Sequence, residues 1–523
     1  LFGPVDASNW QGAKEKLSSD LIPGETAYVV YTEPVLRFPA PNIEIVEVGH
    51  AYRDFLDKVR NDAALPYNSP QDLFCPIGDA WRAEGRSVTY IIITRPDGYI
   101  TGCTGSLVNN TSNNFTPYIL MADHCGCEGQ GAANFDFRFF YWETACNTNS
   151  PNPLAITYVN GAMFRASSGA SDFLLLQMND NPQNDDVVYA GWNRGSEPPT
   201  SSRSLHHSSG YPMLVAQENN AAVVHDTTET VGCSGNMPAG HLWKVIFDVG
   251  GICGRSSGSP LFNQDHRVVG QLVGPLYENP TCPATNVKFG RFNVSWTGGG
   301  TNSTRLSNWL DSAGEGDITV NATTKIKGPD ELCTNGAVYS IPNFRPTSST
   351  FITYTYTWKV SPNLLLMNGQ NTHHPTIAAN ISNPSTGAPG TISVEVKVGS
   401  VIVCASERKV TAYGSSINDD CPFYLNGGGT EQGGVQLPAA LDFLIIPNPA
   451  GSRMPVSLAL PEKTDETFHV RISDLGGKIV FDQQNLSGGI SNLGIVRNLQ
   501  PGFYAVQIIA SGGKVSTRQW VVE

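Results

Sequence analysis

The sequence predicts an all-β protein of several domains, and three observations lead to that prediction. Only 15% of the residues are charged, while the 523-residue chain contains 53 glycines and 35 prolines. Short runs rich in Val, Ile, Thr and Tyr alternate with turn residues, which is typical of β-strands joined by short connections. The chain is also longer than one hydrophobic core supports, so three or four domains are expected.

The overall charge and the missing motifs exclude several classes of function. A net charge of −13 argues against a nucleic-acid partner, because nucleic-acid-binding domains usually carry a basic patch or stripe. The sequence has no run of about 18 apolar residues, so no membrane-spanning helix is expected. It also has no glycine-rich phosphate loop, metalloprotease helix or redox motif, and we expect neither a cofactor nor a metal.

The eleven cysteines indicate an oxidising compartment. They lack the paired CxxC spacing of a structural zinc site. Secreted β-domains usually bridge their cysteines, so we expect disulfides between distant segments and a location outside the cytoplasm. Because the count is odd, at least one thiol is free or bonded elsewhere.

Most of the clear strand patterns fall in the first 300 residues. The expected strands there are Ser87–Thr94, Ser106–Asn109, Tyr118–Asp123, Phe173–Gln177, Val268–Val273 and Gly290–Trp296. Thr304–Leu310 is expected to be a short closing helix, because its apolar residues share one helical face.

Three residues in this region have the local contexts of a catalytic triad. His124 ends an apolar strand, Asp172 opens a buried strand, and Ser257 lies in a tight loop of small residues before another strand. A serine hydroxyl needs an adjacent imidazole to take its proton, and the imidazole needs a carboxylate to fix its tautomer. Each residue alone fits a structural role better. Their joint occurrence in the order His, Asp, Ser predicts a serine peptidase site.

The loop around Ser257 suits a nucleophile. Its small residues allow a sharp turn that aims backbone N–H groups at one point, and those of Arg255 and Ser257 would form an oxyanion hole. Each such donor contributes about 3 kcal/mol to catalysis. Residues 254–258 also match the elbow motif of α/β-hydrolases formally. That motif requires a helix after the serine and an Asp and then a His downstream, whereas here Pro260 and a strand-like sequence follow.

Residues 70–315 resemble the lysyl-endopeptidase branch of the trypsin-like serine proteases. The segments that carry the resemblance are Cys103–Thr111, Tyr118–Cys125, Ser171–Phe173, Ala190–Arg194, His206–His207, Ser256–Pro260, Val269–Leu272 and Gly290–Asp311. The resemblance implies a chymotrypsin-like double β-barrel over 67–325, with the active site between the barrels. By position it makes His124 the general base, Asp172 the orienting carboxylate and Ser257 the nucleophile.

The resemblance also implies disulfides. Cys103–Cys125 and Cys75–Cys146 match bridges of that family, and Cys253 stands where such enzymes place a cysteine bridging the substrate pocket, with Cys282 as its expected partner. A fourth pair, Cys333–Cys404, is expected within the following domain. The pairing of Cys127, Cys233 and Cys421 stays open.

The chain departs from the family pattern at its expected specificity pocket. Val287 replaces the lysine-binding aspartate, Gly251 supplies no acid, and Val273 replaces a pocket histidine. A basic P1 side chain would be buried without a partner, which is costly, so a neutral or apolar P1 residue is expected. Arg255 replaces a glycine of the oxyanion loop, where glycine adopts conformations that other residues disfavour, so an altered hole is also expected.

The flanking segments resemble modules of Bacteroidetes surface proteins. Residues 1–66 resemble the end of a pro-region, and 326–425 resemble an Ig/PKD-like β-sandwich. A Gly-rich linker, 426–440, precedes residues 441–523, which resemble the C-terminal β-sandwich sorting domain of type IX secretion cargo. These resemblances imply an extracellular or outer-membrane-surface location and, for residues 441–523, the secretion machinery or a surface protein as partner.

Three functions fit these observations. The leading hypothesis is a serine endopeptidase that hydrolyses protein or peptide substrates through an acyl-enzyme. The second is a catalytically weak protease fold that serves as a binding or structural component, which Arg255 and the altered pocket favour. The third, a carbohydrate-binding adhesin, is supported only by the sandwich modules and scattered aromatic residues.

Overall fold

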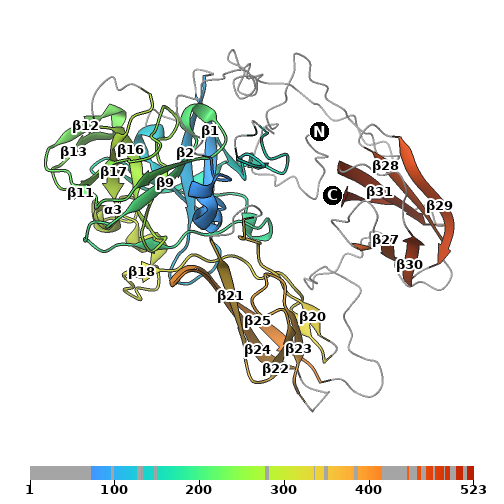
Figure 1. Cartoon of the computed structure of the whole chain (residues 1–523). Coiled ribbons are helices and arrows are strands. Elements are labelled where there is room, and N and C mark those ends of the chain that lie inside the picture. Colours follow the sequence, from blue (N-terminus) through green and yellow to red (C-terminus); the bar gives the residue numbers. More distant parts are fainter. Residues whose placement is uncertain are drawn as a thin grey trace, which may run out of the picture. The chain divides into compact units, whose positions relative to one another are not determined.

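The structure is a computed structural model. It describes residues 72–414, apart from short gaps at 96–98, 127–130, 132–133, 147, 149, 277–281, 335, 347–351 and 382–386, and the strands between 444 and 522. The segments 1–66 and 426–440 lie outside the described residues. The chain divides into two compact units, 1–419 and 420–523 (Figure 1). Within the described residues, no helix has the length and apolar character needed to cross a membrane.

The first barrel is a seven-stranded antiparallel sheet with the order β5-β4-β1-β2-β3-β7-β6. Its inner strand β1 has the sequence VTYIIIT and is buried along almost its whole length, as suits β-branched residues. The elements are η1 (Pro76–Trp81), α2 (Arg82–Gly85), β1 (Val88–Thr94), β2 (Ile100–Val108), β3 (Tyr118–Ala122), η2 (Asp123–Cys125), β4 (Phe135–Phe139), β5 (Ile156–Tyr158), β6 (Ala162–Ser168) and β7 (Phe173–Met178).

The second barrel is built on a nine-stranded sheet whose main path is β10-β9-β15-β16-β17-β14-β11. Strand β8 pairs with β16, and β18 pairs with β8. A separate hairpin, β12–β13, follows β11. The elements are β8 (Trp192–Asn193), η4 (Pro182–Asn184), β9 (Ser202–His206), η5 (Ser208–Gly210), β10 (Leu214–Glu218), β11 (Val223–Val224), β12 (Glu229–Val231), η6 (Gly232–Ser234), β13 (Gly235–Met237), β14 (Leu242–Ile246), β15 (Pro260–Asn263), β16 (Val268–Pro275), β17 (Asn286–Arg291) and β18 (Thr319–Val320).

One predicted strand is wrong over half its length. Gly290–Trp296 was expected to be a strand, but β17 ends at Arg291 and helix α3 (Phe292–Thr297) begins at the next residue. The buried residues of α3 recur at a spacing of three and four, which is the helical period. Helix α4 (Ser307–Leu310) forms the second half of the predicted helix Thr304–Leu310.

The disulfides agree with three of the four expected pairs. The structure contains Cys75–Cys146, Cys103–Cys125 and Cys253–Cys282. Cys233 and Cys333 are disulfide-bonded as well.

The fourth expected pair, Cys333–Cys404, is wrong. Cys404 is a free thiol in the core, and burial raises its pKa to about 12. Leu332, next to Cys333, pairs with Ala412 at the end of β25 (Val401–Ala412). Cys404 lies eight positions before Ala412 along β25, which places the two Cα atoms about 26 Å apart. A disulfide requires Cα atoms within about 7 Å.

Residues 319–414 contain a β-sandwich. One sheet has the order β19-β25-β24-β21 and the other β20-β23-β22. Along β21 and β24 the buried and more exposed residues alternate, as expected for strands with one face in a core. The remaining strands are β19 (Glu331–Leu332), β20 (Ala337–Val338), β21 (Tyr354–Val360), β22 (Leu364–Asn368), β23 (Thr376–Ala379) and β24 (Ala388–Val398).

This sandwich shares its core with residues that precede and follow the strands of the first barrel. Ala83 and Val188 belong to the same buried cluster as the sandwich residues. The hydroxyl of Tyr354 accepts a hydrogen bond from the Arg82 N–H and donates one to the Asp79 carbonyl, both at 3.1 Å. The two modules therefore pack within a single compact unit.

The described part of the second unit is built from strands. Its sheets have the orders β26-β27-β30 and β29-β28-β31-β32. The buried residues of β28 and β31 alternate along each strand, so this sheet has one apolar face. The strands are β26 (Leu444–Ile446), β27 (Val456–Leu460), β28 (Thr467–Asp474), β29 (Ile479–Ser487), β30 (Gly489–Gly494), β31 (Gly502–Ala510) and β32 (Val515–Val522).

Candidate active site

His124 and Asp172 lie together because the strands that carry them are neighbours. Strands β3 and β7 run antiparallel, with Ala122 opposite Phe173. His124 follows the end of β3, and Asp172 precedes the start of β7. The pairing thus brings the imidazole and the carboxylate to the same edge of the first barrel, although 48 residues separate them in the chain.

The carboxylate of Asp172 is completely buried and uses both oxygens. Its Oδ2 lies 2.7 Å from Nδ1 of His124, and its Oδ1 accepts the His124 backbone N–H at 2.9 Å. The hydroxyl of Ser234 donates to the same Oδ1 at 2.9 Å. These bonds hold the carboxylate in one orientation, and a carboxylate at Nδ1 keeps the imidazole proton there, which leaves Nε2 as the basic nitrogen.

The surroundings of His124 raise the pKa of its imidazole. Burial alone would lower its pKa, but the hydrogen bond and the charge of Asp172, with the charge of Asp123, outweigh burial and raise the pKa above 6.5. The side chain keeps 20% of its surface exposed, so a substrate can reach it. A more basic imidazole is a better proton acceptor, provided that the pH leaves it neutral.

Ser257 enters the site from the second barrel. Its carbonyl accepts the Thr104 N–H of β2 at 2.8 Å, which ties the loop of Ser257 to the first barrel. The next residue must be glycine, because Gly258 has a φ of +85° and a Cβ there would lie 2.3 Å from the Thr104 carbonyl oxygen.

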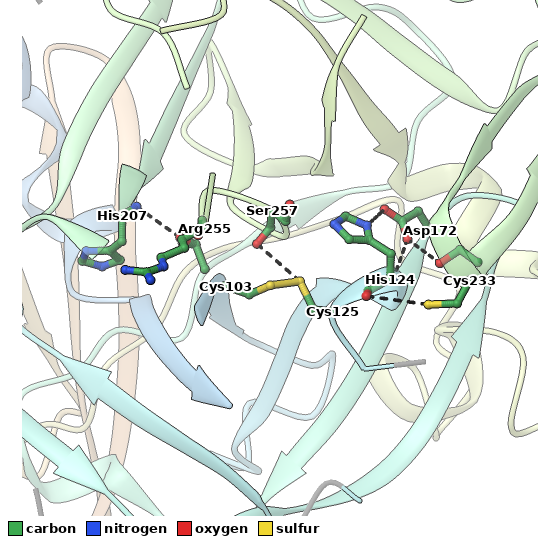
Figure 2. The surroundings of a disulfide bond; sticks show 10 residues. Cys103, His124, Cys125, Asp172, His207, Cys233, Arg255 and Ser257 are labelled. Carbon is green, nitrogen blue, oxygen red and sulfur yellow. Dashed lines mark hydrogen bonds and ion pairs between the residues drawn. A yellow bond between two sulfur atoms is a disulfide. The ribbon is translucent and has the colours of Figure 1, made fainter. Parts of the chain in front are cut away.

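The three expected triad residues are gathered at one place between the barrels. Figure 2 shows the imidazole of His124 between Asp172 and Ser257, so the side chains form a row in the expected order. The described side chains of Ser257 and His124 are not hydrogen-bonded to each other in this structure. Such bonds are often long without substrate and tighten in the Michaelis complex.

Arg255 adopts the backbone conformation that glycine would favour. Its φ is +74°, in the left-handed region that is costly for an L-residue. Its carbonyl accepts the Thr104 hydroxyl at 3.0 Å, and its guanidinium donates to the Ser209 carbonyl at 3.1 Å. Figure 2 shows this side chain extending toward His207 and away from Ser257. The substitution therefore leaves the space beside Ser257 free of the arginine side chain.

Ser234 is a site residue that the sequence analysis missed. It lies at the tip of the β12–β13 hairpin, which Glu229 anchors to the barrel through bonds of 2.9 Å to Lys288 and 2.8 Å to His225. The Cys233 sulfur lies 3.9 Å from the His124 carbonyl oxygen. A lone serine in a polar loop carries no motif, so only the folded chain reveals its contact with Asp172.

Two of the three expected pocket residues lie together. Val287 belongs to a buried apolar cluster with Ile252, Phe289 and Ala284. Gly251 is packed against the same cluster, since a Cβ there would lie 2.8 Å from the Ala284 carbonyl oxygen. Val273 packs elsewhere, in a separate buried cluster that contains Met237 and Leu242.

Comparison with known proteins agrees with this architecture. Residues 68–288 match the family model of the lysyl endopeptidase C-terminal domain. Residues 319–411 match a PKD-like domain, and 444–523 match a secretion system C-terminal sorting domain. The chain therefore combines a trypsin-like protease domain, a PKD-like domain and a type IX sorting tail. The sorting tail indicates an extracellular or outer-membrane-surface location.

A curated relative is the lysyl endopeptidase of Pseudomonas aeruginosa. It is 29% identical over 278 residues, which cover 50% of this chain and 57% of the relative. Among solved structures, the active form of a protease from M. tuberculosis has a TM-score of 0.30 at 13% identity, covering 43% of this chain and 83% of its own. A Glu endopeptidase has a TM-score of 0.28 at 14% identity, covering 43% of this chain and 92% of its own.

Proposed function

We propose that the protein is a serine endopeptidase with His124, Asp172 and Ser257 as its catalytic triad. The observation that carries the proposal is the buried Asp172 carboxylate 2.7 Å from Nδ1 of His124, with Ser257 on the other side of the ring. The match of residues 68–288 to a lysyl endopeptidase domain supports it.

The proposed reaction proceeds through an acyl-enzyme. Nε2 of His124 takes the Ser257 hydroxyl proton as Oγ attacks the scissile carbonyl carbon, and Asp172 stabilises the imidazolium. The N–H groups of Arg255 and Ser257 are the proposed donors to the oxyanion. The imidazolium then gives its proton to the leaving amine, and a water repeats the sequence to release the acid.

The substrate pocket is proposed to take a neutral or apolar P1 side chain. Val287 is buried in the apolar core of the second barrel, and Gly251 packs against that core, so neither position offers a counter-charge to a bound side chain. Lys288, the neighbour of Val287 on β17, points to the opposite face of the strand and pairs with Glu229 at 2.9 Å. A cationic P1 side chain bound beside these positions would be desolvated without a counter-charge.

The sorting tail is proposed to engage the type IX secretion machinery or an outer-membrane surface partner, while the protease domain acts on protein or peptide substrates. No role in binding nucleic acid is proposed, in keeping with the net charge of −13.

The pH dependence of activity tests the assignment of His124. Proton acceptance requires a neutral imidazole, and the pKa of His124 is raised. We therefore expect kcat/KM to rise with pH and to reach half its maximum above pH 6.5, because kcat/KM reports the free enzyme. Initial rates on a soluble peptide between pH 5 and 9 provide the measurement. An acid limb centred below pH 6.5 would show that Asp172 does not raise the basicity of the base.

Cleavage of a peptide library by the purified chain tests the P1 preference. Peptides with P1 Leu, Phe or Met are expected to be cleaved at least about 100-fold faster than matched peptides with P1 Lys or Arg, because burying an unpaired charge costs several kcal/mol. Mass spectrometry of the products gives the cleavage positions. A clear preference for P1 Lys would refute the apolar pocket while leaving the triad assignment intact.

A further inference from the structure

A turn beside the nucleophile loop contains an unusual set of buried polar groups. His206 ends β9 and Ser208 begins the turn that follows, and both side chains are buried. Ser256, the neighbour of the nucleophile, is buried as well. Its Oγ lies 2.8 Å from the Ser208 Oγ and 3.3 Å from His206 Nδ1, and the Ser208 Oγ lies 3.0 Å from that nitrogen.

The same turn contacts successive residues of the nucleophile loop. The Cys253 N–H donates to the Ser208 Oγ at 2.9 Å, and the Ser209 N–H donates to the Gly254 carbonyl at 2.6 Å. The Arg255 guanidinium then donates to the Ser209 carbonyl at 3.1 Å. We call residues 206–209 the cradle. The cradle is thus hydrogen-bonded to each of residues 253, 254, 255 and 256.

The hydrogen-bond directions in the cradle are consistent. Burial lowers the pKa of His206 to about 3, so its ring is neutral at any working pH. A neutral ring with its proton on Nε2 accepts the Ser208 hydroxyl at Nδ1. Ser208 then accepts both the Cys253 N–H and the Ser256 hydroxyl.

This array has an energetic cost. The Nε2 atom of His206 is buried and has no hydrogen-bond partner among the described residues. A buried polar atom without a partner costs about 1–3 kcal/mol, so an apolar residue at this position would serve stability better. The bond at Nδ1 is therefore expected to serve something other than stability.

We propose that His206, Ser208 and Ser256 are positioning residues that hold the nucleophile loop in its reactive conformation. This inference rests on the proposed peptidase function. The Ser256 side chain is turned inward, and Arg255, with its left-handed backbone, is bonded to the cradle. Together these contacts fix the orientation of the peptide between Ser256 and Ser257, and therefore the direction of the Ser257 N–H. Loss of the array would let this peptide rotate and would weaken the oxyanion hole while leaving substrate contacts in place.

Ser208→Ala and Ser256→Ala in the full chain test the proposal. We expect each variant to lower kcat and the rate of labelling by a fluorophosphonate about 10- to 100-fold, while KM changes less than about threefold. The double variant is expected to lose about as much as either single variant, because both hydroxyls act through one array. Rates of hydrolysis and labelling are expressed per folded molecule, and thermal unfolding checks that each variant is folded.

Ser204→Ala is the matched control. Ser204 lies on the same strand as His206, is equally buried, and pairs with the Ser259 hydroxyl at 3.2 Å outside the cradle. It is expected to label at close to the wild-type rate. The inference is overturned if the wild type labels and both Ser208→Ala and Ser256→Ala label as fast as Ser204→Ala. It is also overturned if kcat and KM change together in these two variants. A folded wild-type chain that does not label would overturn the proposed function, and this inference with it.

Discussion

Ser257→Ala is expected to lower kcat for peptide hydrolysis roughly 10⁶-fold, because the nucleophile and its base act as a unit in serine peptidases. The change removes one hydroxyl from a half-buried side chain that lies next to His124 (Figure 2), so the fold should not change. The residual activity would come from substrate binding and the oxyanion donors alone. The measurement is kcat on the peptide found in the library experiment, with thermal unfolding as the check on folding.

Fluorophosphonate labelling gives the same variant a second readout. The wild-type chain should take up one label at Ser257, and Ser257→Ala should take up none. A variant that still hydrolyses peptides at more than about one hundredth of the wild-type rate would place the nucleophile elsewhere. An intact wild-type chain that neither labels nor hydrolyses would instead support a protease fold used for binding.

Asp172→Asn has the second largest expected effect, a loss of about 10⁴-fold in kcat near neutral pH. The reason lies in the contacts of the two carboxylate oxygens. Oδ1 accepts two donors, the His124 N–H and the Ser234 hydroxyl. An asparagine would keep its carbonyl oxygen there and turn its NH₂ group toward Nδ1 of His124. That NH₂ group would donate to Nδ1 and force the imidazole proton onto Nε2, where the base needs a lone pair.

Asp123→Asn is the control for this variant. Asp123 neighbours His124 in the chain and its charge also raises the pKa of the imidazole, but it is Asp172 that hydrogen-bonds to the ring. We expect Asp123→Asn to lower kcat less than about tenfold and to shift the acid limb of the pH profile toward lower pH. Equal losses in the two variants would mean that charge near the imidazole, and not control of its tautomer, explains the role of Asp172.

The strand pattern predicted the all-β fold class, and it explains how two of the proposed site residues come together. The apolar runs before His124 and after Asp172 form the neighbouring strands β3 and β7, and their pairing explains why the two side chains meet. The errors arose where local signals compete. The segment 290–296 combines β-type and helix-type spacing, and the spacing of its aromatic residues prevailed.

The Cys333–Cys404 pair failed for a reason that spacing in the sequence cannot reveal. A disulfide depends on the distance between Cα atoms, and parallel pairing of β19 with the far end of β25 separates these two residues. Arg255 has a conformation that spacing in the sequence does not reveal either. Its departure from glycine predicted an altered oxyanion loop, and that stays a prediction. The structure adds that its backbone has a positive φ and that it is bonded to Thr104 and Ser209.

The sequence by itself determined the all-β class, the protease-like domain and the residue types of the proposed triad, because these follow from local periodicity and from the chemistry of a few side chains. Only the tertiary structure decided that Ser234 bonds to Asp172, that Ser208 and His206 contact Ser256, and that the sandwich shares a core with Ala83. Each of these contacts joins residues far apart in the chain. Their geometry depends on how strands pair and barrels pack, which no local pattern encodes.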